Sequence, residues 1–339
     1  MNTSRNLSGK RIFVTGADGF IGSHLTAAAV AAGARVTALS LYNSFDQCGW
    51  LDDLADDIRR ETEIVRGDIR DAQQMAALCR GQDIVIHLAA LISIPYSYEA
   101  PSSFVETNVG GTLNVLTASR DCDVGRLVHT STSEVYGSAQ SKPIREDHPL
   151  QAQSPYAASK IAADAMAQAF ARTYGLAVFV LRPFNTYGPR QSERAVISTA
   201  IRQFLDPGLD VVRLGNLAPA RDFNYVSDTV AAFLGAAKTD VPHDQNGTAF
   251  NAGSGRMVSI ADVVDLVRCE TGSNKPVEQE TDRLRPRDSE VLELQADATR
   301  LKDLTGWSPE IALEAGIRET VAWWRERLPG VRRESSHIP

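Results

Sequence analysis

Three features that often assign a chain to a specialised class are scarce in this sequence of 339 residues: cysteine, long apolar runs and clustered positive charge. The four cysteines are scattered without paired spacing, at Cys48, Cys79, Cys122 and Cys269. This scarcity argues against a disulfide framework or a zinc site and favours reduced thiols, so we expect no metal. The longest apolar stretch, around 84–94, is interrupted by His87 and Ser93 and is too short to cross a bilayer.

Positive charge does not gather anywhere along the chain. Lys and Arg number 35 against 42 Asp and Glu, which gives a net charge of −7. We therefore expect no nucleic-acid partner, and an anionic substrate would need local positive groups. Residues 1–10 are polar and lack the apolar core of a signal peptide. Together with the scattered thiols, this predicts a cytoplasmic protein with no membrane partner.

The chain does contain a regular alternation of short apolar segments with helical patterns. Segments typical of strands occur in this order: 11–15, 35–39, 63–66, 83–88, 126–130 and 176–181. Because helical patterns separate them, the economical arrangement is an α/β fold with a Rossmann-type, doubly wound parallel sheet.

After Arg190 this pattern loosens. The elements expected there are separated by loops containing proline and glycine, and they are a helix over 195–205, a strand over 210–214 and a helix over 226–237. We therefore expect a dinucleotide-binding domain over residues 1–182 that carries the catalytic residues. Residues 183–330 would form mainly a smaller C-terminal substrate-binding lobe, and residues 331–339 a polar tail.

A glycine-rich turn follows the first expected strand. Gly16, Gly19 and Gly22 are spaced as GxxGxxG, with Phe20 and Ile21 between the last two, and an alanine-rich helix follows. Glycines let the backbone approach a pyrophosphate, and a helix N-terminus supplies N–H groups and a positive dipole end. A turn that only packs is the alternative, but the place of this turn between a strand and a helix predicts a dinucleotide site.

The second expected strand lacks the residue that commonly marks the cofactor. Sites that bind NAD usually place an Asp or Glu at the end of this strand, where it holds the adenosine ribose. Here the strand runs into Ser40-Leu-Tyr-Asn-Ser44, with no acid before Asp46 and no nearby Arg to mark a 2′-phosphate. The residues alone therefore leave the choice open; we take NAD as the expected cofactor, with NADP as the alternative.

Two further strand ends complete the predicted cofactor site. Asp68 and Ile69 follow the third expected strand, where an Asp can hold an adenine amino group or cap the next helix. The residues after the fourth expected strand are small or apolar: Leu88, Ala89 and Ala90. Small side chains there let a flat cofactor lie close to the backbone. His87, within the apolar run, is interpreted as a core histidine.

Tyr156 and Lys160 lie four residues apart at the head of an expected helix, which places them one turn apart on one face. The lysine charge favours the phenolate, so the tyrosine can act as a base near neutral pH. Beside a dinucleotide site, such a base suits the oxidation of a secondary alcohol. Taken alone, the same spacing is typical of an ordinary amphipathic helix.

Hydroxyl groups and one carboxylate follow the fifth expected strand, in the run Ser131, Thr132, Ser133 and Glu134. The carboxyl ends of central strands are where α/β sheets bind ligands. The candidate catalytic residues are therefore Thr132, Ser133, Glu134, Tyr156 and Lys160. The alternative interpretation of Glu134 is a salt-bridged loop carboxylate.

Arginines occur in or beside loops of the expected second lobe, at Arg221, Arg285 and Arg287. Guanidinium groups bind phosphate oxygens in pairs, which suits a phosphorylated substrate. A solvated surface position is the alternative for each of them.

Motifs of a known family follow one another in order: Gly16-x-x-Gly19-x-x-Gly22, His87-Leu-Ala-Ala90, Ser131-Thr-Ser-Glu134, Tyr156-x-x-x-Lys160 and Arg182-Pro-Phe-Asn185. From Lys10 to about Glu326, the chain resembles the extended short-chain dehydrogenase/reductase family of nucleotide-sugar epimerases, dehydratases and decarboxylases. The resemblance implies a nucleotide-diphosphate sugar as substrate. It also implies a homodimer in which the helices after Pro101 and after Tyr156 pair.

Loop motifs indicate a closer likeness within that family. They are Leu41-Tyr-Asn-Ser-Phe45, Gly49-Trp-Leu51, Pro189-Arg-Gln191 and Arg285-Pro-x-x-Ser289-Glu290-Val291. These motifs resemble the nucleotide-hexosamine 4,6-dehydratases of legionaminic-acid-type pathways. Enzymes of that group act on GDP- or UDP-N-acetylglucosamine.

The resemblance implies a role for each matching residue. Thr132 would hydrogen-bond the sugar 4-hydroxyl, and Tyr156 would take its proton while a hydride leaves C4. Lys160 would hold the nicotinamide ribose and lower the pKa of the tyrosine. Glu134 would remove the C5 proton, after which water leaves from C6 and the hydride returns there. The residues implied to hold the sugar diphosphate are Asn185, Arg221 and Arg285.

Two departures from the family pattern leave the reaction open. One is the missing acid after the second strand. The second is Thr132-Ser133-Glu134 where familiar dTDP-glucose dehydratases have Thr-Asp-Glu: Ser133 is a poor acid, so the proton for the departing hydroxyl comes from Glu134, from water or from elsewhere. The run also resembles UDP-glucuronate decarboxylases, in which Arg190 would grip a 6-carboxylate of the substrate. The sequence is compatible as well with a 4-epimerase, a 5,6-dehydratase or a non-catalytic dinucleotide sensor.

Overall fold

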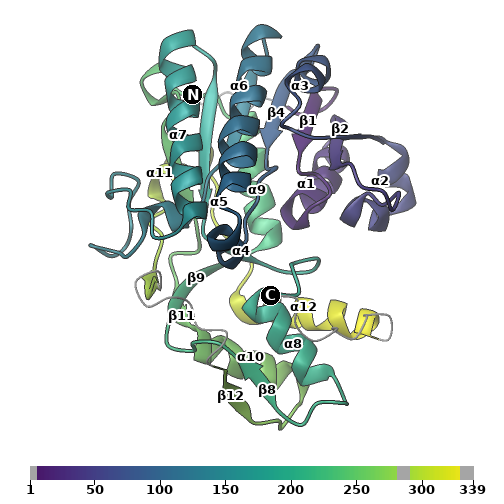
Figure 1. The fold of residues 1–339 in the computed structure, drawn as a ribbon, viewed down its shortest axis with the longest axis vertical. Helices are drawn as coiled ribbons and strands as arrows, with labels where there is room; N and C mark the ends of the chain where they lie inside the picture. Colours follow the sequence, from purple (N-terminus) through teal and green to yellow (C-terminus); the bar gives the residue numbers. More distant parts are fainter. Residues whose placement is uncertain (1–5, 281–290, 329–339) are drawn as a thin grey trace.

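A seven-stranded parallel sheet lies at the centre of the protein (Figure 1). The computed structural model describes residues 6–280 and 291–328. The strands stand in the order β10-β6-β5-β4-β1-β2-β3, and each neighbouring pair is parallel. Their bounds are β1 (Arg11–Thr15), β2 (Arg35–Leu41), β3 (Thr62–Gly67), β4 (Ile84–His87), β5 (Arg126–Thr130), β6 (Val178–Pro183) and β10 (Ala249–Ala252). The prediction of an α/β fold with a doubly wound parallel sheet is confirmed.

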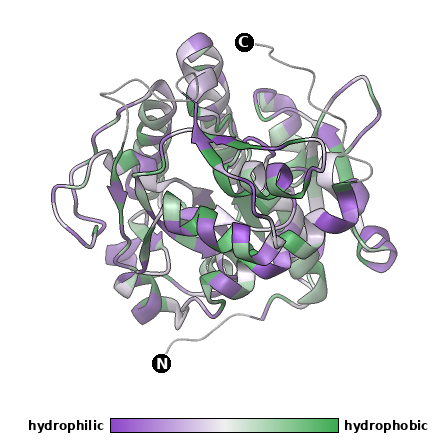
Figure 2. Ribbon diagram, turned by 90° about the horizontal axis from the view of Figure 1, so that it is seen from below, coloured by the Kyte–Doolittle hydropathy of each residue, from purple (hydrophilic) through white to green (hydrophobic). Residues whose placement is uncertain are grey.

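Helices cover both faces of this sheet, which is why its strands are apolar on both sides. Along β1, Ile12 and Val14 belong to one hydrophobic cluster, and Phe13 between them belongs to another. The first cluster joins the sheet to α1 (Phe20–Ala31) and α9 (Val226–Lys238), and the second joins it to α3 (Ala72–Cys79), α6 (Thr112–Asp121) and α7 (Pro155–Tyr174). In Figure 2 the helices carry both hydrophilic and hydrophobic colours, as helices with one face on a core do.

Much of the chain after β6 forms a second, smaller lobe, drawn in the lower part of Figure 1. In it, β9 (Ala220–Tyr225) pairs with β7 (Asn185–Tyr187), β11 (Met257–Ser259) and β13 (Glu293–Leu294), and β8 (Val212–Leu214) pairs with β12 (Val277–Gln279). The helices of this lobe are α8 (Val196–Leu205), α10 (Ile260–Thr271) and α12 (Leu313–Arg327). Val14 of the sheet, Ile201 of α8 and Trp324 of α12 belong to one hydrophobic cluster, so the two lobes share a core.

The remaining described helices are short. They are α2 (Asp56–Arg60), α4 (Ile94–Glu99), α5 (Pro101–Phe104), α11 (Thr299–Thr305), and 3₁₀ turns over Gly49–Asp53, Ser133–Tyr136 and His243–Gln245. The four cysteines are free thiols.

Three observations differ from the arrangement expected from the sequence. The chain returns to the central sheet after residue 183, because α9 packs on β4, β5 and β6 and β10 pairs with β6. Arg221, expected in or beside a loop, lies within β9 opposite Val258 of β11. The helical pattern after Pro101 is interrupted by a π-helical stretch, Val105–Gly111, whose two glycines weaken the regular helix there.

Helix α7, with 20 residues, carries the buried carboxylate of Asp164. This carboxylate accepts hydrogen bonds from His129 Nε2 at 3.2 Å, from Ser131 Oγ at 2.7 Å and from Arg182 Nη2 at 3.0 Å. His129 lies in β5, Ser131 follows that strand and Arg182 lies in β6, so one side chain ties α7 to two strands.

Among the described residues, no helix has the length and apolar character needed to span a membrane.

The electrostatic balance of this cluster keeps Asp164 charged. Burial on its own raises the pKa of the carboxyl, but hydrogen bonds from His129 and Ser131 and the charge of Arg182 hold it below its ordinary value. Burial lowers the pKa of His129, which favours a neutral ring whose Nε2 donates to Asp164. The side chains of Asp164 and Arg182 are only 1% and 2% exposed, so they form a buried ion pair.

Asp164→Ala should lower the free energy of unfolding by about 3–5 kcal/mol, because Arg182 is then left buried without its anion. Urea unfolding of both proteins measures the difference. Asp265→Ala is the matched control: its ion pair with Arg268 is exposed, at 60% and 43% of the two side chains, and its removal should change stability by less than about 1 kcal/mol. Equal losses in the two variants would contradict the role given to Asp164.

Candidate functional site

The predicted glycine turn lies where the strand order reverses, at the carboxyl ends of β1 and β4. Gly16 has a φ of +66°, and a Cβ on it would lie 2.7 Å from the amide nitrogen of Ala89. A Cβ on Gly22 would lie 2.0 Å from the carbonyl oxygen of Gly16. The first glycine therefore permits the sharp turn, and the last permits α1 to pack closely on it.

The N-terminus of α1 offers hydrogen-bond donors to an anion. Gly19 is its N-cap residue, no side chain caps it, and its first turn contains no acidic residue. The N–H groups of Phe20, Ile21 and Gly22 have no partner within the helix by geometry. Their dipoles add a partial positive charge at the same point, which fits the pyrophosphate of a dinucleotide.

Thr15 and His87 hold the end of β4 against the glycine turn. The Thr15 hydroxyl accepts from the Ala89 amide at 3.2 Å and lies 2.7 Å from His87 Nδ1. His87 Nε2 lies 3.0 Å from the hydroxyl of Thr112, so both ring nitrogens are bonded inside the protein. The ring is 2% exposed and burial lowers its pKa well below the ordinary value. The interpretation of His87 as a core histidine is confirmed, and Leu88, Ala89 and Ala90 lie beside the turn that it supports.

Asp68 lies at the end of β3, but its carboxylate already has a partner. It accepts two hydrogen bonds from Arg70 Nε, at 2.9 and 3.1 Å, and the Arg70 side chain holds its pKa below the ordinary value. The cap of the following helix is Asp71, whose side chain accepts from the Gln74 amide at 3.0 Å. Asp68 is therefore not the helix cap, and its role toward adenine stays a prediction.

Asn108, which the sequence reasoning did not select, joins three parts of the site. Its side chain binds both the amide and the carbonyl of Leu91, at 2.8 and 2.9 Å, and donates to Ser159 Oγ on α7 at 2.9 Å. Gly111 in the same π-helical stretch leaves room for Ile69, since a Cβ there would lie 2.4 Å from the Ile69 side chain. An Asn two residues before the pair Gly110-Gly111 in a helical pattern was the signal available in the sequence.

The candidate catalytic residues come from two elements that meet at the carboxyl end of β5. Thr132 is the N-cap of the 3₁₀ turn Ser133–Tyr136, and its hydroxyl accepts from the Glu134 amide at 3.2 Å. Ser133 is buried, while Thr132 and Glu134 are half-buried. Tyr156 begins α7 and is 7% exposed.

The shifts of the tyrosine pKa indicate which groups surround the phenol. Burial raises the pKa of Tyr156, the Thr132 hydroxyl opposes this shift, and the charge of Glu134 adds to it. Thr132, Glu134 and Tyr156 thus lie close together, and their catalytic roles stay a prediction.

Lys160 is buried one turn further along α7, and its ammonium donates to the carbonyl of Thr130 at 2.5 Å. Burial lowers the pKa of Lys160 to about 8. Burial has the largest effect on the pKa of Tyr156 and raises it, so the lowering expected from Lys160 is not seen.

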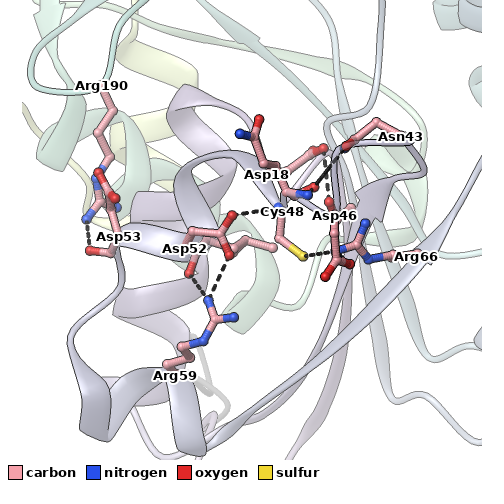
Figure 3. A network of polar contacts seen from close by, with 12 residues as sticks. Asp18, Asn43, Asp46, Cys48, Asp52, Asp53, Arg59, Arg66 and Arg190 are labelled. Carbon is pink, nitrogen blue, oxygen red and sulfur yellow. Dashed lines mark hydrogen bonds and ion pairs between the residues drawn. The ribbon is translucent and has the colours of Figure 1, made fainter. Parts of the chain in front are cut away.

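The predicted substrate-binding residues lie on different segments. Asn185 opens β7, and its buried side-chain oxygen has no hydrogen-bond partner among the described residues. Arg221 is 6% exposed and donates to the carbonyls of Ala220 and Leu292, both at 3.1 Å. Arg190 has a φ of +69° and donates to the carbonyl of Asp53 at 3.2 Å (Figure 3). Arg285 lies outside the described residues.

Comparison with known proteins shows similarity along nearly the whole chain. Residues 13–320 match a family model described as GDP-mannose 4,6 dehydratase. A dTDP-glucose 4,6-dehydratase from Actinoplanes sp. is 34% identical over 325 residues, which cover 93% of this chain and 98% of that protein.

Solved structures of two enzymes share the fold. DesIV, a dTDP-glucose 4,6-dehydratase from Streptomyces venezuelae with NAD bound, has 33% identity and a TM-score of 0.82, and the match covers 93% of this chain and 97% of that one. A UDP-glucose 4-epimerase from Thermotoga maritima with UDP-glucose has 29% identity and a TM-score of 0.84, covering 94% and 99%. The similarity therefore extends over both lobes and includes dehydratases and epimerases.

Gly22→Ala should lower the free energy of unfolding by about 1–3 kcal/mol, because the added methyl group overlaps the Gly16 carbonyl and forces the turn away from α1. Thermal and urea unfolding measure this loss. Gly235→Ala is the control within α9: its added Cβ meets nothing closer than 3.7 Å, and alanine favours a helix, so stability should stay or rise by up to about 1 kcal/mol. A neutral Gly22→Ala would contradict the close packing described for the turn.

Proposed function

The chain belongs to the extended short-chain dehydrogenase/reductase family of NAD-dependent epimerases and dehydratases, and from this premise we propose that it is a nucleotide-sugar 4,6-dehydratase. Its proposed substrate is GDP- or UDP-N-acetylglucosamine, and its product is the corresponding 4-keto-6-deoxy sugar. The proposed cofactor is NAD, which DesIV holds in its structure. The glycine turn, the uncapped N-terminus of α1 and the small residues after β4 fit such a dinucleotide.

The position of Glu134 is the observation that favours dehydration over 4-epimerisation. Elimination of water across C5 and C6 of a 4-keto sugar needs a base near C5, whereas a 4-epimerase needs no such carboxylate. Glu134 stands two residues beyond Thr132 in the same 3₁₀ turn, and its charge acts on the Tyr156 phenol. A half-buried carboxylate beside the expected base is the arrangement that dehydration requires.

The first stage removes the hydrogens of the sugar 4-hydroxyl group and of C4. Thr132 holds the 4-hydroxyl, Tyr156 takes its proton, and the ammonium of Lys160 stabilises the phenolate through its charge once the site is filled. A bound NAD, held by the glycine turn and the N-terminus of α1, would supply the acceptor for the C4 hydride and the hydride donor at C6.

The second stage is the elimination. The new 4-ketone acidifies the C5 proton, which Glu134 takes and passes to the departing 6-hydroxyl, so that water leaves. We assign the proton donation to Glu134 because Ser133 is buried and is a weak acid. A solvent-derived proton enters at C5 as C6 is reduced, and the proton that Tyr156 took is released to solvent, which balances the reaction.

Two different functions compete with this proposal. A UDP-glucuronate decarboxylase would need a cation at the substrate's 6-carboxylate, and Arg190 instead donates to the backbone of Asp53. In the dehydratase, Asn185, Arg221 and Arg285 would bind the diphosphate. The amide oxygen of Asn185, which has no partner within residues 6–280 and 291–328, is consistent with a ligand there. A non-catalytic sensor would have no use for Thr132, Glu134, Tyr156 and Lys160 together.

We also propose a homodimer that pairs through α7. Its alanines fall into two sets: Ala157 and Ala163 are buried, whereas Ala158 and Ala165 are exposed and Ala162 is half-buried. The outward set is spaced by about one turn and leaves room for a second helix to approach closely. Val105, 57% exposed beside this helix, would add apolar surface to the contact.

Mass spectrometry with a substrate panel should show loss of one water from a nucleotide hexosamine. The panel contains GDP- and UDP-N-acetylglucosamine, dTDP-glucose and UDP-glucuronate, and no cofactor is added because it is regenerated in each cycle. Proton NMR should then show a 6-methyl group, which a 5,6-dehydratase product lacks. Loss of carbon dioxide from UDP-glucuronate would identify a decarboxylase instead. No change of mass in any substrate would overturn the dehydratase proposal.

Glu134→Gln should stop the incorporation of solvent deuterium at C5 and abolish product formation, while a single hydride transfer to bound cofactor remains. The loss of activity should be about 10²-fold or more, since the amide cannot act as a base. Absorbance at 340 nm follows the trapped reduced cofactor, and NMR follows the exchange.

Tyr156→Phe is the companion variant, because it should block the earlier step and give neither reduced cofactor nor exchange. Unchanged exchange in Glu134→Gln would remove Glu134 from the mechanism. Turnover that survives in Tyr156→Phe would show that Tyr156 is not the base.

A further inference from the structure

The carboxyl end of β2 does carry a carboxylate, but β2 does not supply it. The strand ends in Ser40 and Leu41, and the first acid after it is Asp46. In the structure, the Asp18 side chain, from the middle of the glycine turn, reaches this point. Its Oδ2 accepts the backbone N–H of Leu41 at 2.9 Å and, over a longer distance of 3.4 Å, the hydroxyl of Ser40.

The position of Asp18 is held from both sides. The backbone N–H of Trp50 donates to the Asp18 carbonyl at 3.0 Å. Gly49 has a φ of +56°, and a Cβ on it would lie 2.6 Å from the same carbonyl oxygen. The chain after β2 therefore packs directly on Asp18, which fixes the backbone from which the carboxylate projects.

Only one oxygen of this carboxylate is used inside the described part of the protein. Both contacts go to Oδ2, and among the described residues Oδ1 accepts no hydrogen bond. Asp18 itself is half-buried. An ionised carboxylate has room for about four acceptor interactions, so Oδ1 remains able to accept from a ligand hydroxyl.

An acid and an arginine close to this point are engaged with each other. Arg66 lies in β3, directly opposite Ser40 in the sheet register. Its guanidinium pairs with Asp46 at 2.7 Å and donates to Cys48 Sγ at 3.4 Å. Figure 3 shows the polar side chains of this region, among them Asp18, Asp46, Cys48 and Arg66. The prediction that no arginine lies near this strand end was therefore wrong, because pairing of β2 with β3 brings Arg66 beside it.

We propose that Asp18 takes the place of the missing strand acid: its carboxylate accepts a hydrogen bond from the adenosine ribose of NAD and repels the 2′-phosphate of NADP. In Rossmann sites the acid that does this stands at the end of the second strand. Here the glycine turn delivers the same group to the same place. Asp46 supports the exclusion of NADP, since it occupies the guanidinium of Arg66 at this strand end.

This inference rests on the proposed use of NAD, but it is independent of which sugar the enzyme converts. The purified protein is equilibrated with equal concentrations of NAD and NADP, separated from free nucleotide and denatured. The released nucleotides are then quantified by liquid chromatography. Wild-type protein should release NAD in large excess, and release of NADP instead would overturn the cofactor proposal itself.

Asp18→Asn should shift the ratio of retained NAD to NADP toward NADP by about tenfold or more, because a charge-assisted hydrogen bond is lost together with the repulsion of the phosphate. Asp57→Asn is the matched control, since it removes the same charge from an exposed position in α2. An unchanged ratio in folded Asp18→Asn protein, checked by circular dichroism, would overturn the inference.

A ligand-side measurement keeps the test valid if Asp18→Asn folds poorly. Competition in wild-type protein between NAD and its analogue lacking the adenosine 2′-hydroxyl should favour NAD by about tenfold. Asp18→Glu keeps the charge and should continue to exclude NADP. Equal retention of NAD and the 2′-deoxy analogue in wild-type protein would show that no group accepts from this hydroxyl, which also overturns the inference.

Discussion

A single buried carboxylate, that of Asp164, holds α7, the helix that carries Tyr156 and Lys160, on the sheet. It receives hydrogen bonds from His129 in β5 and Arg182 in β6, which tie α7 to both strands. Lys160 lies one turn before it and Tyr156 two turns before it. The geometry of the proposed reaction depends on this anchor, because the phenol must meet Thr132 and Glu134, which come from a different element.

A second constraint acts at the cofactor end, where three backbone segments meet with almost no space between them. Gly16 touches the Ala89 backbone, Gly22 touches Gly16, and Gly49 touches Asp18. There is no space for a side chain at any of these contacts. The groups left to face the proposed dinucleotide are the N–H groups at the start of α1 and the carboxylate of Asp18. The proposed cofactor site is thus built mainly from closely packed backbone.

The strands of the sheet were predictable because each is a short apolar run beside a helical pattern: β1 and β5 have the predicted bounds, 11–15 and 126–130. The candidate catalytic residues could be selected from the sequence because their spacing is local, and their roles stay a prediction. What could not be predicted depends on pairing between distant segments. Arg66 reaches the end of β2 through the sheet register, and Arg221 becomes part of a strand only when β11 and β13 join it. Asn108 binds Leu91 across the two short helices α4 and α5. No periodicity in the sequence reports such contacts.

The measurement that tests the central claim most directly follows a deuterium label placed at C4 of the nucleotide hexosamine. If Tyr156 and Glu134 work in sequence as described, the label leaves C4 and returns to the same molecule at C6, and NMR detects a singly deuterated methyl group in the product. Recovery of the label at C4 with inverted or unchanged stereochemistry would contradict dehydration and indicate an epimerase. Loss of the label to solvent would contradict a hydride held within one catalytic cycle.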